Sequence, residues 1–388
     1  MSYIFLLGRK DEISLAELKA RLSGVSRLSD KTAIFEGKLP LEPQKFLNSL
    51  GGSIKICEVI DEVRNLENCP EFINEYLLEK YADHETKINF GVSVYNLAGK
   101  DEIFLKSTLK SIKNFLKENG KKVRFVNKMF KNVANTAIHD NGLLRHGVEI
   151  CVFGGLNESG EEIYHIAKTV AVQDFKMYGF RDFERPARDQ RSGMLPPKLA
   201  QVMINLSGVK AGKVLWDPFC GSGTVLMEGL LMGINAIGSD ISEKAIQDST
   251  QNLEWLNHHF KIKEQWKVFV QDATKPEKTP KADVIIAETY LGPPLFKAPG
   301  PGKSQEILEE ASDIIFGFLE ENTLKCTIVL AVPFIRGQRE SFYIENFIEK
   351  AEKLGYIVPV LDKQYKSLLY DRPEQVVGRE IFKLKSRH

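Results

Sequence analysis

Cysteine is scarce in this chain of 388 residues, with five copies in all. No two of them form a Cys-x-x-Cys pair, the spacing on which zinc sites and redox centres are commonly built. The lack of paired cysteines also argues against a disulfide framework and favours a reducing compartment. We therefore expect a cytoplasmic protein with no bound metal. The five are Cys57, Cys69, Cys151, Cys220 and Cys326.

Long apolar runs and an excess of charge of one sign are missing too. No run approaches the ~18 apolar residues of a membrane-spanning helix, and Ile4–Leu7 is too short for a secretion signal. We therefore expect no membrane insertion. Lys and Arg total 53 against 52 Asp and Glu, so any nucleic-acid site must come from a local cluster of charge. The length predicts two or three domains of ~150 residues each.

Two sequence patterns that bind phosphates are absent as well. No Gly-Lys-Ser or Gly-Lys-Thr loop occurs, and Leu226 replaces the third glycine of the dinucleotide fingerprint. A glycine-rich loop is nevertheless present at Asp217–Thr224, between the apolar run Val214–Trp216 and a helical segment that ends near Met232. Backbone N–H groups at such a strand–loop–helix junction face a ligand, and glycine lets that ligand come close. The loop predicts a bound nucleoside.

Acidic residues end three successive strand-like runs. Asp217 ends the first run, and Asp240 follows about twenty residues on, where doubly wound folds place an acid for ribose hydroxyls. Asp272 ends the third run. S-adenosyl-L-methionine has no phosphate but carries an ammonium and a sulfonium cation, which suit the acid at Asp217. The alternative, a glycine turn that serves only helix–sheet packing, is disfavoured because the three acids occur in this order.

The glycine loop and the three acids resemble the first three motifs of class I methyltransferases. The resemblance implies a Rossmann-like α/β domain in which Asp217, Gly221 and Gly223 hold the methionine part of the cofactor. It assigns the ribose to Asp240 and the adenine amino group to Asp272. The cofactor-binding residues expected from the resemblance are Pro196, Asp217, Phe219, Gly221, Gly223, Thr224, Asp240, Ile241, Asp272, Ala273 and Glu288.

The N-terminal part of the chain alternates short strands with helices. Ser14 and Glu17 have the spacing of a capping box, which predicts that Ser14 caps the first helix. The β-α-β-α-β pattern predicts a small ferredoxin-like layer over residues 1–62, and a second α/β segment follows over residues 63–166. Strands are expected at 3–7, 32–36, 54–60, 87–95, 123–126, 147–153 and 162–165, and further helices at 43–50 and 101–119.

The predicted helix at 101–119 has an apolar stripe beside a basic face. Leu105, Leu109, Ile112 and Leu116 recur at helical spacing, and lysines recur at the same period on an adjacent face. Such a face is either simply solvated or a phosphate-binding surface, and the methyltransferase-like segment that follows favours nucleic acid. The RNA contacts that we expect are Lys106, Lys110, Lys113 and Lys117, with Arg181, Arg185 and Arg188 farther along the chain.

Segments outside the cofactor loop carry a more specific resemblance. Phe5–Gly8, Ser14–Leu18, the linker at 167–195 and Arg372–Glu380 look like those of archaeal-type tRNA (guanine-N2)-methyltransferases that act at position 10. The resemblance implies three α/β domains: ferredoxin-like, THUMP at 63–166, and Rossmann-like with a seven-stranded sheet at 196–388. It also implies tRNA as the partner and leaves open a small activating protein. The sequence gives no oligomeric state.

The sequence departs from this family at the catalytic motif. The relatives have (Asp/Asn)-Pro-Pro-(Tyr/Phe) after the fourth strand, where this chain has Glu288-Thr289-Tyr290-Leu291. The resemblance implies that Glu288 accepts an N–H from the exocyclic N2 amine of a guanosine. A gapless match places Leu291 at the position of the stacking aromatic, so we expect Tyr290 to stack on the extruded base through a loop that is one residue tighter. Two alternatives remain. One is an RNA- and cofactor-binding protein with a degenerate site, and the other is an amino-methyltransferase acting on ribosomal RNA or DNA.

Overall fold

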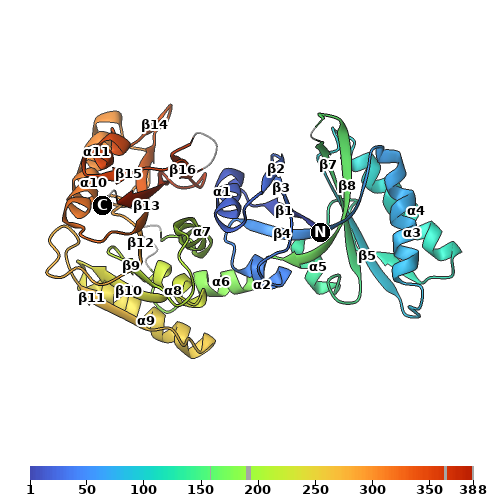
Figure 1. The fold of residues 1–388 in the computed structure, drawn as a ribbon, viewed down its shortest axis with the longest axis horizontal. Coiled ribbons are helices and arrows are strands. Elements are labelled where there is room, and N and C mark those ends of the chain that lie inside the picture. Colours follow the sequence, from blue (N-terminus) through green and yellow to red (C-terminus); the bar gives the residue numbers. More distant parts are fainter. Residues whose placement is uncertain (158, 189–193, 362–364, 387–388) are drawn as a thin grey trace. The chain divides into compact units, whose positions relative to one another are not determined.

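The computed structural model describes residues 1–157, 159–188, 194–361 and 365–386 (Figure 1). Two compact units can be distinguished by their internal contacts. Unit 1 comprises residues 1–11, 22–48 and 53–174, and unit 2 comprises residues 12–21, 49–52 and 175–388. The chain therefore passes from one unit to the other five times.

Unit 1 is built on one eight-stranded sheet, blue to green in Figure 1. The strand order is β2-β3-β1-β4-β8-β7-β5-β6. Strand β5 pairs in parallel with β6 and β7, and the other neighbouring pairs are antiparallel. The strands are β1 (Ser2–Leu7), β2 (Ser26–Ser29), β3 (Thr32–Glu36), β4 (Ser53–Val63), β5 (Ile88–Tyr95), β6 (Val123–Phe125), β7 (Val148–Leu156) and β8 (Glu162–Val172).

Helices α3 and α4 supply much of the core of unit 1. The predicted apolar stripe of α4 is buried, and it packs with Ile73 and Leu77 of α3 and with Phe90 of β5. Helix α3 was not predicted from the sequence. The helices of unit 1 are α2 (Pro43–Asn48), the 3-10 helix η1 (Leu66–Asn68), α3 (Cys69–Lys80), α4 (Asp101–Glu118) and α5 (Asn135–Asp140).

Strand β8 corrects the predicted linker. The strand was expected to end at residue 165, but it continues to Val172 because it pairs with β4 on one side and β7 on the other. The predicted linker at 167–195 therefore begins inside a strand, and residues 189–193 of it lie outside the described residues. The predicted boundary between residues 62 and 63 falls inside β4, so one sheet runs through both predicted N-terminal domains.

Unit 2 contains a nine-stranded sheet with the order β11-β10-β9-β12-β13-β17-β15, beside which β14 pairs with β13 and β16 with β17. Strands β9 to β13 pair in parallel along this path, and β17 runs antiparallel to β13 and β15. The path has the seven strands that the resemblance implied, and β14 and β16 are additional. The strands are β9 (Val214–Asp217), β10 (Asn235–Asp240), β11 (Trp266–Val270), β12 (Val284–Glu288), β13 (Thr327–Arg336), β14 (Ser341–Phe342), β15 (Tyr356–Ile357), β16 (Ser367–Tyr370) and β17 (Val377–Ser386).

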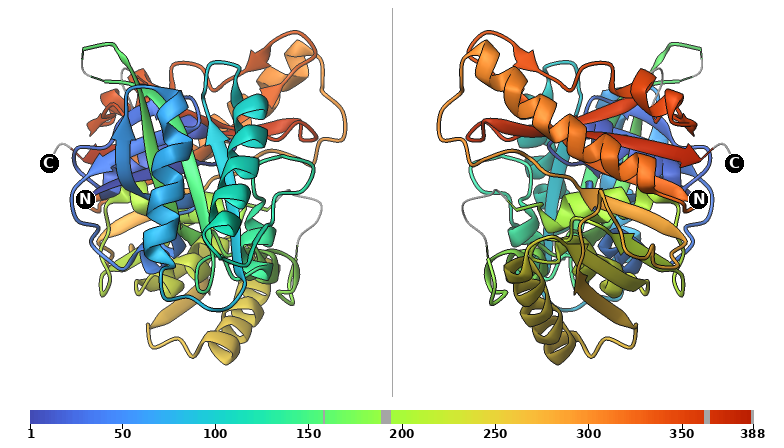
Figure 2. Two further views of the ribbon diagram at one scale, coloured as in Figure 1. Left: turned by 90° about the vertical axis from the view of Figure 1, so that its right-hand side faces the viewer. Right: turned by 90° about the vertical axis from the view of Figure 1, so that its left-hand side faces the viewer.

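Helices cover both faces of this sheet. Val284 and Ile286 of β12 join a core with α7 and α8, whereas Ile285 and Ala287 join a second core with α10. This alternation is the two-residue period of a strand buried on both faces. Figure 2 shows α10 (orange) crossing the sheet. The helices of unit 2 are α1 (Asp11–Arg21), α6 (Phe175–Phe183), α7 (Pro197–Ser207), α8 (Thr224–Leu231), α9 (Glu243–Phe260), α10 (Pro301–Glu321) and α11 (Phe347–Lys353).

The predicted cap of the first helix is wrong. Helix α1 begins at Asp11, so Ser14 lies inside it and is buried. Acidic residues in a first turn favour a helix start, and Asp11 and Glu12 supply them here. The Glu17 carboxylate does not cap its own helix, because it accepts the backbone N–H groups of Gly51 and Gly52. Within the described part of the chain, no helix is long and apolar enough to cross a lipid bilayer.

Candidate active site

The glycine loop lies between β9 and α8 in unit 2. Gly221 has φ +50° and Gly223 has φ +83°, the left-handed region that glycine adopts without strain. A Cβ atom on Gly223 would lie 3.2 Å from the hydroxyl of Ser249, which is closer than most side-chain contacts. The loop therefore depends on glycine both for its backbone conformation and for its packing against α9.

The three predicted acids are brought to the carboxyl ends of adjacent strands. Asp240, the last residue of β10, accepts the N–H of Gly221 at 3.0 Å and the N–H of Ser242 at 2.9 Å. Asp272 follows β11 and accepts both the N–H and the hydroxyl of Thr274 at 2.8 Å. In doubly wound folds this edge of the sheet is where ligands bind.

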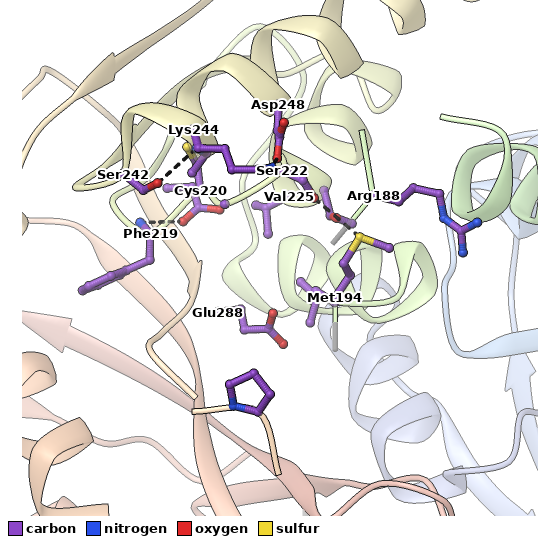
Figure 3. A pocket seen from close by; sticks show the side chains of 16 residues that line it. Arg188, Met194, Phe219, Cys220, Ser222, Val225, Ser242, Lys244, Asp248 and Glu288 are labelled. Atoms are coloured by element: carbon purple, nitrogen blue, oxygen red, sulfur yellow. Dashed lines mark hydrogen bonds and ion pairs between the residues drawn. The ribbon is translucent and has the colours of Figure 1, made fainter. Parts of the chain in front are cut away.

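Two adjoining cavities open at this edge. The larger has a volume of about 720 Å³, and the smaller about 440 Å³. Phe219 and Glu288 line both, so the two cavities meet at these side chains. Figure 3 shows the larger cavity, with Glu288 between Phe219 and Met194. Both volumes are in the range of small-molecule sites.

Asp217 is the most buried of the acids at this site, at 2% exposed. Burial raises the pKa of its carboxyl well above the usual range. The N–H of Phe219, which donates to it at 3.0 Å, lowers that pKa, and the charges of Asp240 and Glu288 raise it again. A carboxyl in this environment is stabilised as a carboxylate by a nearby cation. The arrangement therefore suits a positively charged ligand.

Glu288 ends β12 and is held by an arginine that the sequence analysis did not identify. The Nε atom of Arg379 donates to Oε1 of Glu288 at 2.7 Å, and Arg379 is only 2% exposed. The next residue, Thr289, donates its N–H and its hydroxyl to the carbonyl of Ala331, at 3.0 and 3.2 Å. The sequence signal for this pair was weak, because Arg379 lies in a strand that also carries Glu380, Lys383 and Lys385.

Comparison with known proteins agrees with this geometry. Residues 185–294 match a family model described as "RMKL-like, methyltransferase domain". A tRNA (guanine(10)-N2)-dimethyltransferase of Methanothermobacter thermautotrophicus is 34% identical over 134 residues, or 34% of this chain and 38% of the relative. A protein of Methanothermococcus thermolithotrophicus, described as a probable tRNA (guanine(10)-N2)-dimethyltransferase, is 33% identical over 121 residues, or 30% of this chain and 73% of that relative.

The chain belongs to the tRNA (guanine-N2)-methyltransferase family. Human THUMPD2, a U6 snRNA (guanine-N(2))-methyltransferase, is 30% identical over 96 residues, or 24% of this chain and 18% of that protein. The chain thus spans less than two fifths of the length of several relatives. The crystal structure of TrmN from Thermus thermophilus has a TM-score of 0.55 at 14% identity and covers 100% of both chains. The predicted Rossmann-like methyltransferase fold is confirmed.

Most of the predicted cofactor residues of this tRNA (guanine-N2)-methyltransferase family member line one of the two cavities. Pro196 and Gly223 line neither, because Pro196 caps α7 and Gly223 caps α8. The larger cavity is lined by Asp217, Phe219, Gly221, Thr224 and Glu288, and the smaller by Phe219, Asp240, Ile241, Asp272, Ala273, Glu288 and Tyr290.

Two of the three arginines expected to bind RNA are buried instead. Arg181 forms a two-pronged ion pair with Glu228 of α8, at 2.7 and 3.1 Å, and both side chains are buried. Arg185 is 2% exposed and donates to the hydroxyl of Thr224 at 2.7 Å. Both contacts are made to α8, the helix that follows the glycine loop, and they stabilise it. The predicted phosphate contacts of Arg181 and Arg185 are therefore wrong. Arg188 lines the larger cavity, and its RNA contact stays a prediction.

The basic face of α4 in unit 1 is formed as expected. Lys106, Lys110 and Lys117 are exposed, and Lys113 is half-buried. The ammonium groups of Lys106 and Lys113 each lie 5.5 Å from an aromatic ring centroid, those of Phe130 and Phe125. The face is therefore accessible to phosphates, and its RNA-binding role stays a prediction. No group of three or more potential metal ligands occurs among the described residues.

Proposed function

We propose that the chain transfers a methyl group from S-adenosyl-L-methionine to the exocyclic N2 amine of a guanosine in tRNA. The observation that carries the proposal is the convergence of Asp217, Asp240 and Glu288 on two cavities that meet at Phe219 and Glu288. A site that gathers three carboxyl groups, one of them nearly buried, favours a cationic nucleoside over a phosphorylated one. Membership of the family supports the same reaction.

Each acid has a role that fits its surroundings. Asp217 is buried and lies near the negative charges of Asp240 and Glu288, so it would bind the positively charged methionine part. Asp240 is fixed by two backbone N–H groups, so its carboxylate is oriented to accept ribose hydroxyls. Asp272 lines the smaller cavity with Ile241 and Ala273, which suits the adenine ring and its amino group.

Glu288 is the residue that we assign to the target amine. When bound, S-adenosylmethionine supplies an electrophilic methyl group, so the reaction depends chiefly on placing the nucleophile in line. The lone pair of a guanine amine is delocalised into the ring. An acceptor at Glu288 orients the N–H bonds and favours attack by that lone pair. Tyr290, which lines the smaller cavity beside Glu288, offers a ring on which the extruded base can stack.

The RNA assignment rests on the relatives and on the basic face of α4. The archaeal relatives are named for guanosine 10 of tRNA, and we propose the same nucleotide here. Residues 63–166 would act as a THUMP RNA-binding domain that carries the four lysines of α4. The five cysteines are free, in keeping with a cytoplasmic enzyme. A small activating protein partner remains part of the proposal.

Methyl transfer from labelled cofactor to purified tRNA tests the proposal. We expect label in a transcript with guanosine at position 10, none when that nucleotide is replaced by adenosine, and a product identified by mass spectrometry as N2-methyl- or N2,N2-dimethylguanosine. Glu288→Gln should bind both ligands and transfer the methyl group roughly 10- to 100-fold more slowly. Label in U6 snRNA, ribosomal RNA or DNA instead would contradict the tRNA assignment. Binding of both ligands without transfer would favour the degenerate-site alternative.

A further inference from the structure

Arg379 and Glu288 lie on strands that are not neighbours. Glu288 on β12 is in register with Ala331 on β13, and Arg379 on β17 is in register with Pro333 of the same strand. Strand β13 therefore separates the two residues. Because adjacent strands lie ~4.8 Å apart, the backbones of β12 and β17 are separated by two such spacings. Only two long side chains can meet across that distance. The small side chain of Ala331 leaves room for them on the shared face of the sheet.

The guanidinium of Arg379 is also fixed from its other side. Its Nη1 atom donates to Oε1 of Gln375 at 3.1 Å and to the carbonyl of Val377 at 3.4 Å. A planar guanidinium that is hydrogen-bonded along two edges has a fixed orientation, and it therefore also fixes the carboxylate that it binds. Glu288 is therefore positioned by residues on the C-terminal strand rather than by the loop that follows it.

One oxygen of Glu288 remains for the ligand. Oε1 accepts from Arg379, whereas Oε2 accepts no hydrogen bond from the described part of the chain. The Glu288 side chain is 18% exposed and lines both cavities. The charge of Arg379 also offsets that of Glu288, which lies close enough to Asp217 to act on it. Among the described contacts of Asp217, Asp240 and Asp272, none is with a cationic side chain, whereas Glu288 is paired with Arg379.

We propose that Arg379 is a positioning residue for methyl transfer, because it binds Oε1 of Glu288 and so directs Oε2 toward the target amine. The inference rests on the proposed function and explains the departure from the family motif. Glutamate is needed here because the carboxylate must reach across β13 to Arg379. An aspartate would fall short by about one methylene and would leave a buried guanidinium without its acid.

A double-mutant cycle tests the pair. Glu288→Gln and Arg379→Gln should each lower kcat by roughly 10- to 100-fold, the range that a misplacement of about 1 Å costs, with KM for cofactor and tRNA nearly unchanged. The double variant should be no slower than the slower single variant, because Arg379 acts only through Glu288. Arg379→Lys should recover part of the rate. Lys385→Gln, an exposed change on the same strand, is the matched control and should have the wild-type rate.

The other outcomes are distinguishable. Calorimetric titration with cofactor counts the folded sites in each variant, so a loss of folding is separated from a loss of kcat. If Arg379→Gln does not fold, Glu288→Asp and Arg379→Lys carry the same test. Unchanged kcat in the arginine variants, or effects that add in the double variant, would overturn the inference and leave the proposed function intact. A wild-type protein that methylates no RNA would overturn both.

Discussion

The side-chain amide of Asn205 donates to Oε1 of Glu17 at 2.6 Å, which joins α1 to α7 although the two residues are 188 positions apart. The same carboxylate accepts the backbone N–H groups of Gly51 and Gly52 at 2.8 and 2.7 Å. Glu17 is completely buried, and burial raises the pKa of its carboxyl to about 7. A structural acid of this kind makes the stability of unit 2 depend on pH.

The direction of that dependence follows from the two pKa values. In the unfolded chain the Glu17 carboxyl has its ordinary pKa of 4.5, whereas in the folded protein the pKa is about 7. Between these values the unfolded state releases a proton that the folded state keeps, so the free energy of unfolding falls as pH rises, by up to about 3 kcal/mol. Denaturant unfolding at pH 5 and pH 8 measures it. Glu17→Gln should flatten the difference, and Glu12→Gln, an exposed change on the same helix, should not. If the free energy of unfolding changed equally between pH 5 and pH 8 in the wild type and both variants, Glu17 would not be the group responsible.

Asp217 predicts a pH dependence of opposite sign for cofactor binding. Burial raises the pKa of this carboxyl in the free protein, and a cationic ligand binds its ionised form. S-adenosylmethionine should therefore bind more tightly as pH rises and should release protons on binding, which calorimetry in buffers of different ionisation enthalpy detects. Asp217→Asn should weaken binding and remove the pH dependence. Asp283→Asn is the control, because Asp283 immediately precedes β12 and lies at the opposite end of that strand from Glu288. An affinity that is equal at pH 6 and pH 8 would exclude Asp217 from the cation site.

The basic face of α4 predicts a salt dependence. Replacing Lys106, Lys110, Lys113 and Lys117 by Gln should weaken tRNA binding and lower the slope of log affinity against log salt by about 1 for each phosphate that the protein no longer neutralises. Cofactor affinity should not change. Gel shifts over a salt series measure the slope. Four exposed lysines of unit 2 replaced in the same way, at 278, 303, 325 and 353, form the control set. An unaltered slope would show that the α4 face is merely solvated.

Replacing Thr289 by the proline of the family motif should lower the stability of the protein. The N–H and the hydroxyl of Thr289 both donate to the carbonyl of Ala331. Proline has neither donor, so Thr289→Pro should leave that buried carbonyl without both bonds and destabilise the protein by about 1–3 kcal/mol. Thr289→Val keeps the N–H and should cost less. Thermal unfolding of the three proteins compares them. A proline variant as stable as wild type would mean that the loop can adopt the relatives' conformation.

The sequence predicted the features of the site that follow from local spacing. The glycine loop and the strand-end acids Asp217, Asp240 and Asp272 are recognisable because residues close in the chain form one junction, and the fold repeats that junction from strand to strand. The apolar stripe of α4 was predictable for the same reason, since helical periodicity is a local property. The family model and the relatives confirm the fold that these patterns indicated.

Contacts between distant residues were not predictable in this way. Arg181 occurs in a polar segment that looked like an exposed linker, and its acid partner Glu228 is 47 residues away in an apolar helix. Glu17 has the spacing of a capping residue, but the donors that it serves come from Gly51 and Gly52. In each case a local pattern suggested one partner and tertiary packing provided another.

The assignment of α1 to unit 2 has a consequence for the order of synthesis. Helix α1 places Ile13 and Ala16 in the core formed by α7 and α8. At ~5–20 residues per second a ribosome reaches Asn205 roughly 10–40 s after Glu17. During that interval the apolar face of α1 has no docking surface and is exposed to chaperones and to aggregation. Unit 2 therefore cannot finish folding until its earliest and its later segments have both left the ribosome. A shortened chain that starts after α1 would expose the core that this helix covers.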